Sequence, residues 1–165
     1  MSEIVYIGLG SNLSTPKERC LEAKERLASQ AEISVVQCSA LYETEPVGEI
    51  PQDWFINAVL CAQTSLSPLQ LLHCLQEIEH EMGRVRKDKW GPRIIDLDLL
   101  FFANKIMGHK ELILPHPEVE NRRFVLAPMA EIAGDFIHPV AQKSIQQLLD
   151  ELQDDSVVRQ ISTKD

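Results

Sequence analysis

The chain has 165 residues, of which 25% are charged and 44% hydrophobic, and a formal net charge of −9, which fits one domain spanning residues 1–165. Such an acidic chain is not expected to bind nucleic acid or an anionic membrane through its whole surface, because that binding requires a net basic field. The four cysteines are widely spaced, which predicts reduced thiols and no zinc site. The sequence has neither a basic and apolar leader nor an apolar run of roughly 18 residues, so a cytoplasmic protein is expected.

Hydrophobic periodicity and turn residues predict that strands and helices alternate along the chain. Thr15 and Glu18 predict a capping box at the first helix, and Ser67 and Ser144 begin two further capping boxes. The polar tail from about residue 153 is expected to be frayed. The predicted strands are residues 4–9, 33–42, 55–64, 94–102 and 112–114, and the predicted helices are residues 16–30, 68–82, 125–132 and 144–152.

The order strand, helix, strand, strand, helix, strand predicts an α+β fold with a ferredoxin-like βαββαβ core, in which helices pack on one face of an antiparallel sheet. The remaining helices then form a C-terminal helical extension. The connection over residues 43–54 is long for a compact domain, and such loops are often functional. The fold alone does not give a function.

One stretch, residues 82–102 (MGRVRKDKWGPRIIDLDLLFF), joins a basic loop to an apolar run with two aspartates. In a strand, Asp96 and Asp98 project from one face with Cα atoms about 6.5–7 Å apart. That separation suits a shared magnesium site. Both faces of the strand are apolar, with Leu100 and Phe102 beside the aspartates, so carboxylates there are costly unless paired or metal-bound. Buried salt bridges and a solvated edge-strand face are the alternatives.

The basic loop over residues 84–93 has a charge of +4, whereas the remainder of the chain carries −13. Its arginines Arg84, Arg86 and Arg93 offer planar, bidentate recognition of phosphate oxygens. Trp90 and a Gly-Pro pair give the loop shape. This contrast favours a small, highly charged anion over a polymer, and a solvated charge run is the alternative.

Other side chains are open to both a ligand-binding and a structural role. His116 lies between two prolines and Asn57 falls within a predicted strand, where a structural hydrogen bond and a ligand contact are equally consistent. Phe55 and Phe124 are core or surface aromatics by default, but they lie near loops and could stack on a flat ligand. The chain has neither a Walker A nor a Rossmann motif. The residues themselves therefore indicate a metal-assisted phosphate enzyme.

Six segments carry a more specific signal. They are GLGSNL, YETEPVG, FINA, GRVRK, WGPRIIDLDL and PHPEVENRRF, in this order between residues 4 and 139. Together they resemble the 6-hydroxymethyl-7,8-dihydropterin pyrophosphokinase family of folate biosynthesis. The resemblance implies transfer of pyrophosphate from ATP to the hydroxymethyl group of the pterin, release of AMP and a requirement for two magnesium ions. A monomer that binds these small molecules, without nucleic acid or membrane, is expected.

The resemblance also implies roles for individual positions, and the loops around Gly48 and Trp90 are expected to close over both ligands. The catalytic positions are Arg84, Arg93, Asp96 and Asp98, and the two aspartates are also the metal ligands. The ATP-binding positions are Gln76, Glu79, Arg84, Arg86, Lys89, Trp90, Arg93, His116 and Arg122. The pterin-binding positions are Thr44, Val47, Phe55, Asn57, Trp90 and Phe124, with the pterin stacked between the two phenylalanine rings.

The sequence departs from the family pattern at several positions. Glu45 stands where a proline is common, Pro117 replaces a tyrosine, and Glu111 stands where an arginine can hold the nucleotide. The loop before Trp90 is one residue short, with Lys89 in place of an arginine. Two other hypotheses use the same residues: a binding module that holds an anionic metabolite without chemistry, and a metal-dependent nuclease, which the acidic remainder of the chain disfavours.

Overall fold

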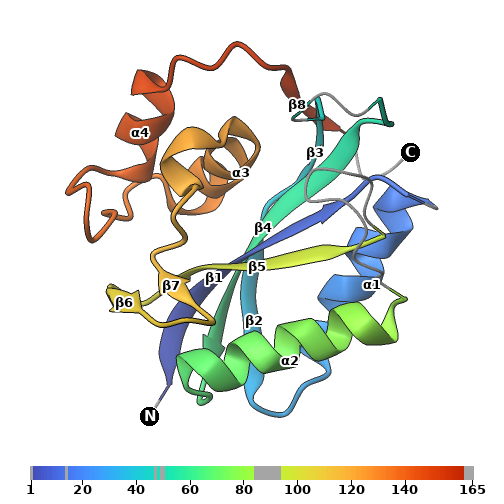
Figure 1. Cartoon of the computed structure of the whole chain (residues 1–165), viewed down its shortest axis with the longest axis vertical. Helices are drawn as coiled ribbons and strands as arrows, with labels where there is room; N and C mark the ends of the chain where they lie inside the picture. The colour runs from blue at the N-terminus through green and yellow to red at the C-terminus, as the bar shows by residue number, and fades with distance from the viewer. Residues whose placement is uncertain (1, 14, 47, 49–50, 84–93, 162–165) are drawn as a thin grey trace.

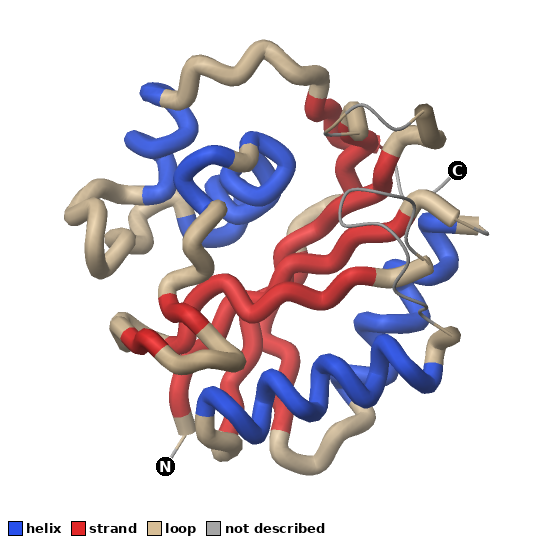
Figure 2. Tube along the Cα trace, in the orientation of Figure 1, coloured by secondary structure: helices blue, strands red, loops and turns tan. Residues whose placement is uncertain are grey.

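The computed structural model describes residues 2–13, 15–46, 48, 51–83 and 94–161. These residues form a six-stranded antiparallel sheet in the order β5-β1-β4-β3-β8, with β2 also paired to β4, and helices on both of its faces (Figure 1; Figure 2). The strands of this sheet are β1 (Glu3–Ser11), β2 (Ile33–Cys38), β3 (Leu41–Thr44), β4 (Phe55–Thr64), β5 (Asp96–Phe102) and β8 (Val158–Ile161). A small second sheet pairs β6 (Met107–Gly108) with β7 (Ile113–Leu114). The helices are α1 (Pro16–Ala28), α2 (Pro68–Glu81), α3 (Arg123–Ala133), α4 (Ile145–Glu151) and the 3₁₀ turn η1 (Val119–Asn121).

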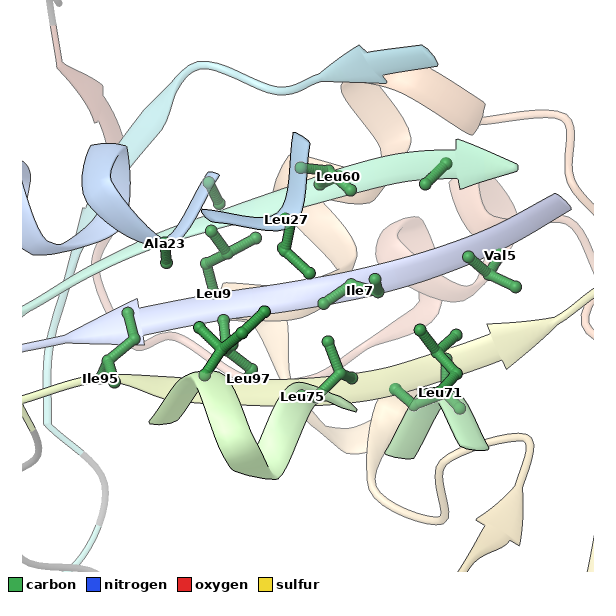
Figure 3. Close-up of a cluster of buried hydrophobic side chains, with 14 of the residues drawn as sticks. Val5, Ile7, Leu9, Ala23, Leu27, Leu60, Leu71, Leu75, Ile95 and Leu97 are labelled. Atoms are coloured by element: carbon green, nitrogen blue, oxygen red, sulfur yellow. The ribbon is translucent and has the colours of Figure 1, made fainter. Parts of the chain in front are cut away.

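Helices α1 and α2 cover one face of the sheet, as the βαββαβ order predicts (Figure 1). Alternate residues of β1, including Ile7, point toward these helices and meet Leu27 and Leu75 (Figure 3). All three of these side chains are 0% exposed. The capping box predicted at Ser67 is formed, because its Oγ accepts from the N–H of Gln70 at 3.3 Å.

Helices α3 and α4 cover the opposite face, so the C-terminal helical extension adds a second core to the molecule. This core packs Leu126 and Met129 of α3 against Tyr6, Val59 and Phe101 of the sheet. The capping box predicted at the start of α4 is also formed. The sheet is therefore covered by helices on both faces, which confirms the α+β class. The predicted βαββαβ core places helices on one face only, and α3 and α4 cover the other.

The prediction of one strand over residues 33–42 is wrong in one respect. The structure has two strands there, and both pair with β4. Ser39 lies between them, donates its N–H to Val59 O at 2.9 Å and accepts from Val59 N through Oγ at 3.0 Å. The N–H of Ala40 instead donates to the carboxylate of Glu131 on α3, at 3.2 Å to each oxygen. A side chain from a distant helix thus accepts the hydrogen bond that the backbone offers at the break between the strands, and local periodicity cannot reveal such a partner.

Strand β5 begins at Asp96 instead of residue 94, and it contains a bulge. Its register against β1 shifts between Tyr6 and Ile7, so Leu100 and Phe101 both join the core beneath α3, whereas Phe102 joins the core beneath α1 and α2. The prediction that Phe102 shares the aspartates' face is therefore wrong, because a bulge inserts one residue into the alternation.

Two expectations for the ends of elements are also wrong. Thr15 has a φ of 56° and makes no side-chain capping bond, since an N-cap needs the extended backbone that lets its oxygen reach the next turn. The tail after residue 153 is not frayed throughout, because β8 pairs with β3 from Leu41↔Ile161 to Thr44↔Val158. Strand β6 was not predicted, and β7 shortens the predicted strand over residues 112–114.

The four cysteines are free thiols, as predicted. Burial raises the pKa of Cys20 to about 12, so this thiol is inert at neutral pH. Among the described residues, no helix has the length and apolar character that a membrane crossing requires.

Candidate functional site

Asp96 and Asp98 lie on strand β5 at the edge of the sheet. They pair across to Gly10 and Gly8 of β1, so no side chain of β1 covers them. Antiparallel partners and residues two apart share a face, which places both carboxylates on the side of the sheet that α3 occupies. Both are partly exposed, and the Asp98 side chain is 30% exposed. The carboxylates are thus directed toward solvent at an otherwise buried strand.

A cavity of about 420 Å³ lies against β5, between α2 and the segment that runs from β6 to Arg122. Its volume falls in the range typical of small-molecule sites. It brings together residues that are far apart in the sequence and that the sequence assigned to ATP or to metal: Gln76, Glu79, Asp96, Asp98, His116 and Arg122.

Glu79 is only 5% exposed although it lines the cavity. Its Oε2 accepts from the N–H of Leu97 at 2.7 Å. Among the described strands, none pairs with the outer side of β5, so this N–H needs another acceptor. Glu79 therefore ties helix α2 to the strand that carries both aspartates, while Gln76, one turn earlier, is exposed at the cavity.

His116 is fixed on the far side of the cavity by its backbone, because its N–H donates to Leu100 O at 2.9 Å. Its Nδ1 accepts from the N–H of Glu118 at 3.1 Å. Burial, and then the positive charge of Arg122, lower the pKa of His116 to about 4. The ring is therefore neutral at pH 7 and carries its proton on Nε2, where it can donate to a ligand oxygen.

Arg122 connects the cavity with the first turn of α3. Its Nη1 lies 3.8 Å from Asp98 Oδ2, and its Cζ lies 5.5 Å from the centre of the Phe124 ring. The Arg122 side chain is 18% exposed, so its charge acts in a partly desolvated place where it is screened less than at the surface.

The predicted pterin-binding residues occupy the same face of the sheet, toward its centre. Asn57 of β4 donates through Nδ2 to Thr44 Oγ1 of β3 at 2.7 Å, and both residues are buried. Asn57 pairs with Gly10, which pairs with Asp96. Two strand spacings therefore separate Asn57 from Asp96, roughly 10 Å between Cα atoms.

The two aromatic candidates lie at element ends next to these residues. Phe55 begins β4 and pairs with Thr44, and Phe124 lies in the first turn of α3; both rings are partly exposed. The structure thus gathers Thr44, Phe55 and Asn57 on two neighbouring strands, with Phe124 on the helix that covers this face.

Gly10 has a role that sequence reasoning did not assign. A Cβ on Gly10 would lie 2.6 Å from Asn57 Oδ1, which is closer than two such atoms can approach. The amide of Asn57 therefore occupies the space above Gly10. A glycine inside a predicted strand often marks a close approach, and this signal could have identified the position.

The hairpin of β6 and β7 adds cavity residues that were also missed, including Lys110. Its strands have two residues each, too few for a periodic signal. Glu111, which stands where the family pattern can have an arginine, lies 2.8 Å from His73 of α2, measured between Oε2 and Nε2. This contact joins the hairpin to α2 at the cavity.

The other predicted positions lie outside the described residues; they are Val47, Arg84, Arg86, Lys89, Trp90 and Arg93. Within the described part of the chain, no group of three or more His, Cys, Asp or Glu side chains is arranged to hold a metal. The Asp96 and Asp98 pair fits magnesium by donor type, since this ion commonly takes one or two carboxylates and completes its shell with phosphate oxygens and water.

The fold is similar to solved structures of HPPK-DHPS chains. A Plasmodium falciparum HPPK-DHPS chain, crystallised with pteroate, matches 92% of this chain with a TM-score of 0.75 at 16% sequence identity. The chain spans 42% of that structure. At this identity the similarity concerns the fold.

Sequence comparison identifies the family. The family model described as 7,8-dihydro-6-hydroxymethylpterin-pyrophosphokinase (HPPK) matches residues 6–134. A Haemophilus influenzae 2-amino-4-hydroxy-6-hydroxymethyldihydropteridine pyrophosphokinase is 40% identical over 93% of this chain and 96% of its own length. The Bacillus subtilis enzyme of the same name is 44% identical over 80% of this chain and 79% of its length. The Pneumocystis carinii folic acid synthesis protein fol1 is 45% identical over 94% of this chain, which spans only 21% of that protein. The chain therefore belongs to the 7,8-dihydro-6-hydroxymethylpterin-pyrophosphokinase family.

Proposed function

We propose that the chain transfers the β,γ-pyrophosphoryl unit of ATP to the hydroxymethyl oxygen of 6-hydroxymethyl-7,8-dihydropterin and releases AMP, a reaction of folate biosynthesis. One structural observation supports this proposal in addition to family membership. Asp96, which lines the cavity, shares one face of the sheet with Asn57 and Thr44, and the residue between Asp96 and Asn57 on that face is Gly10, which has no side chain. A phosphate donor and a flat acceptor can therefore meet at Asp96.

Asp96 and Asp98 are proposed to hold two magnesium ions. Their carboxylates are partly exposed on one face and line the cavity, so oxygen donors converge where a triphosphate would lie. When bound, magnesium ions neutralise the phosphate charge that otherwise repels an attacking oxygen. Glu79 supports this pair by fixing the backbone at Leu97, between the two aspartates.

On the nucleotide side, Arg122 supplies positive charge beside Asp98, and neutral His116 donates from Nε2. The positions outside the described residues complete the proposal. Arg84 and Arg93 stabilise the charge on the transferred group, and Arg86, Lys89 and Trp90 bind ATP. Phosphoryl transfer depends mainly on positioning and charge stabilisation by the protein, so a group of site residues without an obvious general base is sufficient.

On the acceptor side, Asn57 reads the edge of the pterin. Its Nδ2 is oriented by the bond to Thr44 and its Oδ1 by the space above Gly10, so both ends of the amide are fixed before the ligand arrives. Phe55 and Phe124 stack on the two faces of the ring, in the offset or face-on contacts that aromatic side chains favour.

The test is release of AMP from ATP and the hydroxymethyl pterin, measured with and without magnesium. Asp96→Asn and Asp98→Asn keep the side-chain size and are expected to lower turnover at least about 100-fold, because the metal loses a charged ligand. Asp135→Asn, at an exposed residue after α3, is the matched control and should retain full turnover.

Magnesium-dependent AMP release at the normal rate by either aspartate variant would contradict the assignment of the metal site. Ligand-induced stabilisation of the wild-type protein without any AMP would favour the binding module instead. The expectations of a single domain over residues 1–165, of a monomer and of no nucleic-acid partner stay predictions.

A further inference from the structure

The C-terminal strand β8 lies along β3, the short strand that carries Thr44 (Figure 1). β3 has only four residues, and β4 is its partner on the other side. Without β8, β3 would be an exposed edge with unpaired backbone groups. The residues that place the acceptor-side hydroxyl of Thr44 therefore depend on a segment more than a hundred positions later in the chain.

The pairing continues one residue beyond the end of β3. Glu45 N donates to Val157 O at 3.1 Å, and the N–H of Val157 donates to Glu45 Oε1. Glu45 thus uses both its backbone and its carboxylate to hold the tail. A proline at this position could make neither bond, because it has no N–H and no carboxylate.

Arg159 of β8 links the two ends of the connection between β3 and β4. Its Nε lies 3.3 Å from Glu43 Oε2, and its Cζ lies 5.3 Å from the centre of the Trp54 ring. Glu43 precedes Thr44 and Trp54 precedes Phe55 in the chain. An exposed ion pair and an exposed cation–π contact contribute little to stability. The effect of Arg159 is therefore to fix the relative positions of Glu43 and Trp54.

The other end of the same segment is attached to α3. Arg123 donates from Nη1 to Asp154 O at 3.1 Å. Arg123 begins α3 and lies next to Phe124, the second aromatic candidate. The segment over residues 154–161, here named the C-terminal strap, therefore bridges the element that carries Phe124 and the strands that carry Thr44 and Phe55.

We propose that the C-terminal strap is a positioning element for the acceptor, which sets the spacing between the Phe124 side and the Thr44 and Phe55 side of the pterin site. This inference rests on the proposed function. The cavity beside Asp96 is lined by residues of α2, β5 and the region from His109 to Arg122, and no strap residue is among them. The strap should therefore control affinity for the pterin and leave affinity for the nucleotide unchanged.

The test uses the full chain with Arg123→Met and Arg159→Ala combined. This double variant removes the arginine contacts to Asp154, Glu43 and Trp54, keeps the aliphatic volume of Arg123 and leaves the backbone pairing of β3 with β8 in place. The matched control is Arg26→Ala, which removes an arginine of α1 whose exposed ion pairs with Glu22 and Glu81 lie outside the strap. Titration calorimetry measures binding of a non-hydrolysable ATP analogue with magnesium, and then binding of the hydroxymethyl pterin to that complex. Steady-state assays measure kcat and both KM values.

The double variant is expected to bind the pterin about tenfold more weakly and to raise its KM in proportion, while the analogue affinity stays within about twofold of wild type. Arg26→Ala should match wild type for both ligands. Arg159→Ala alone, at a residue with a 60% exposed side chain, is expected to fold and to weaken pterin binding about threefold, so the test stays decisive if the double variant does not fold.

Unchanged pterin affinity in these variants, or equal weakening of both ligands, would overturn the strap as a positioning element. A wild-type protein that binds no pterin and releases no AMP would instead overturn the proposed function, and the strap proposal with it. The wild-type measurement thus distinguishes the two failures.

Discussion

At the scale of single residues, the proposed acceptor side of the site depends on a glycine. Asn57 is 7% exposed, its Nδ2 donates to Thr44, and its Oδ1 lies where a side chain on Gly10 would be. The amide has little room to move because one end is bonded and the other fills a gap in the facing strand. Its orientation is therefore set by packing before a ligand is bound.

Gly10→Ala is expected to displace the Asn57 amide and to weaken pterin binding about tenfold, or about 1.4 kcal/mol. The fold should persist, since the group that must move is the end of a side chain. Gly108→Ala is the control, because an added Cβ at this residue of β6 meets no atom within 4 Å. Equal pterin affinities of the two variants, measured by titration calorimetry, would contradict this reasoning.

At the scale of elements, the turn between α3 and α4 is organised around His138, which is 2% exposed. Its Nδ1 accepts from the N–H groups of Val140 and Ala141, at 3.2 and 3.0 Å, and its Nε2 lies 3.5 Å from Glu120 Oε1. Two donors directed at Nδ1 require that this nitrogen carry no proton. The neutral ring thus holds the turn that precedes α4, while Glu120 faces the Nε2 side.

Burial lowers the pKa of His138, and the negative charge of Glu120 partly opposes this shift. The unfolded chain therefore binds the proton more readily than the folded chain. His138 contributes to the free energy of unfolding above its ordinary pKa of about 6.5. This contribution is lost as the pH falls below that value, by at most about 1.4 kcal/mol per pH unit. In urea unfolding at pH 7 and pH 5, His138→Asn should lose less stability between the two values than wild type. The exposed His80→Asn should behave as wild type, and equal losses in wild type and His138→Asn would refute the assignment.

At the scale of the whole molecule, one face of the sheet carries a continuous core, and the other carries both aspartates and the proposed acceptor residues. The core beneath α1 and α2 is continuous along β1, β4 and β5, as Figure 3 shows for Val5, Ile7, Leu9 and Leu97. The opposite face carries the core beneath α3 and α4 toward one end of β1, and the candidate site residues toward the other. The first face is thus fully packed, whereas the second combines the partly exposed Asp96 with the buried Asn57.

Nucleotide binding should stabilise the whole molecule only when magnesium is present. A non-hydrolysable ATP analogue at about 100 times its Kd contributes about 2.7 kcal/mol, which for a domain of this size raises Tm by about 5–10 °C. Chelation of the metal with EDTA should remove most of this shift, and Asp98→Asn should lack it. A Tm shift of the same size with and without magnesium would argue against metal-mediated binding.

Much of the fold followed from local signals. The strand over Phe55–Thr64 was predicted at its observed bounds, and the capping boxes at Ser67 and Ser144 were predicted from residue type and spacing. Two of the errors share a physical cause, which is a stabilising partner far away in the sequence. The break at Ser39 is stabilised by Glu131 of a distant helix, and β8 is a strand only because β3 offers it an unpaired edge.

The sequence by itself determined the family and the reaction that the family implies, and it predicted Asp96 and Asp98 as the metal ligands, because short motifs and i, i+2 spacing are local properties of the chain. Only the tertiary structure decided that Glu79 is bonded to Leu97 N, that Asn57 lies over Gly10 and that the C-terminal strap spans from α3 to β3. These relations join positions 18 to more than 100 residues apart, or arise from strand register. Register and distant contacts are set by the packing of the whole chain, and no local pattern encodes them.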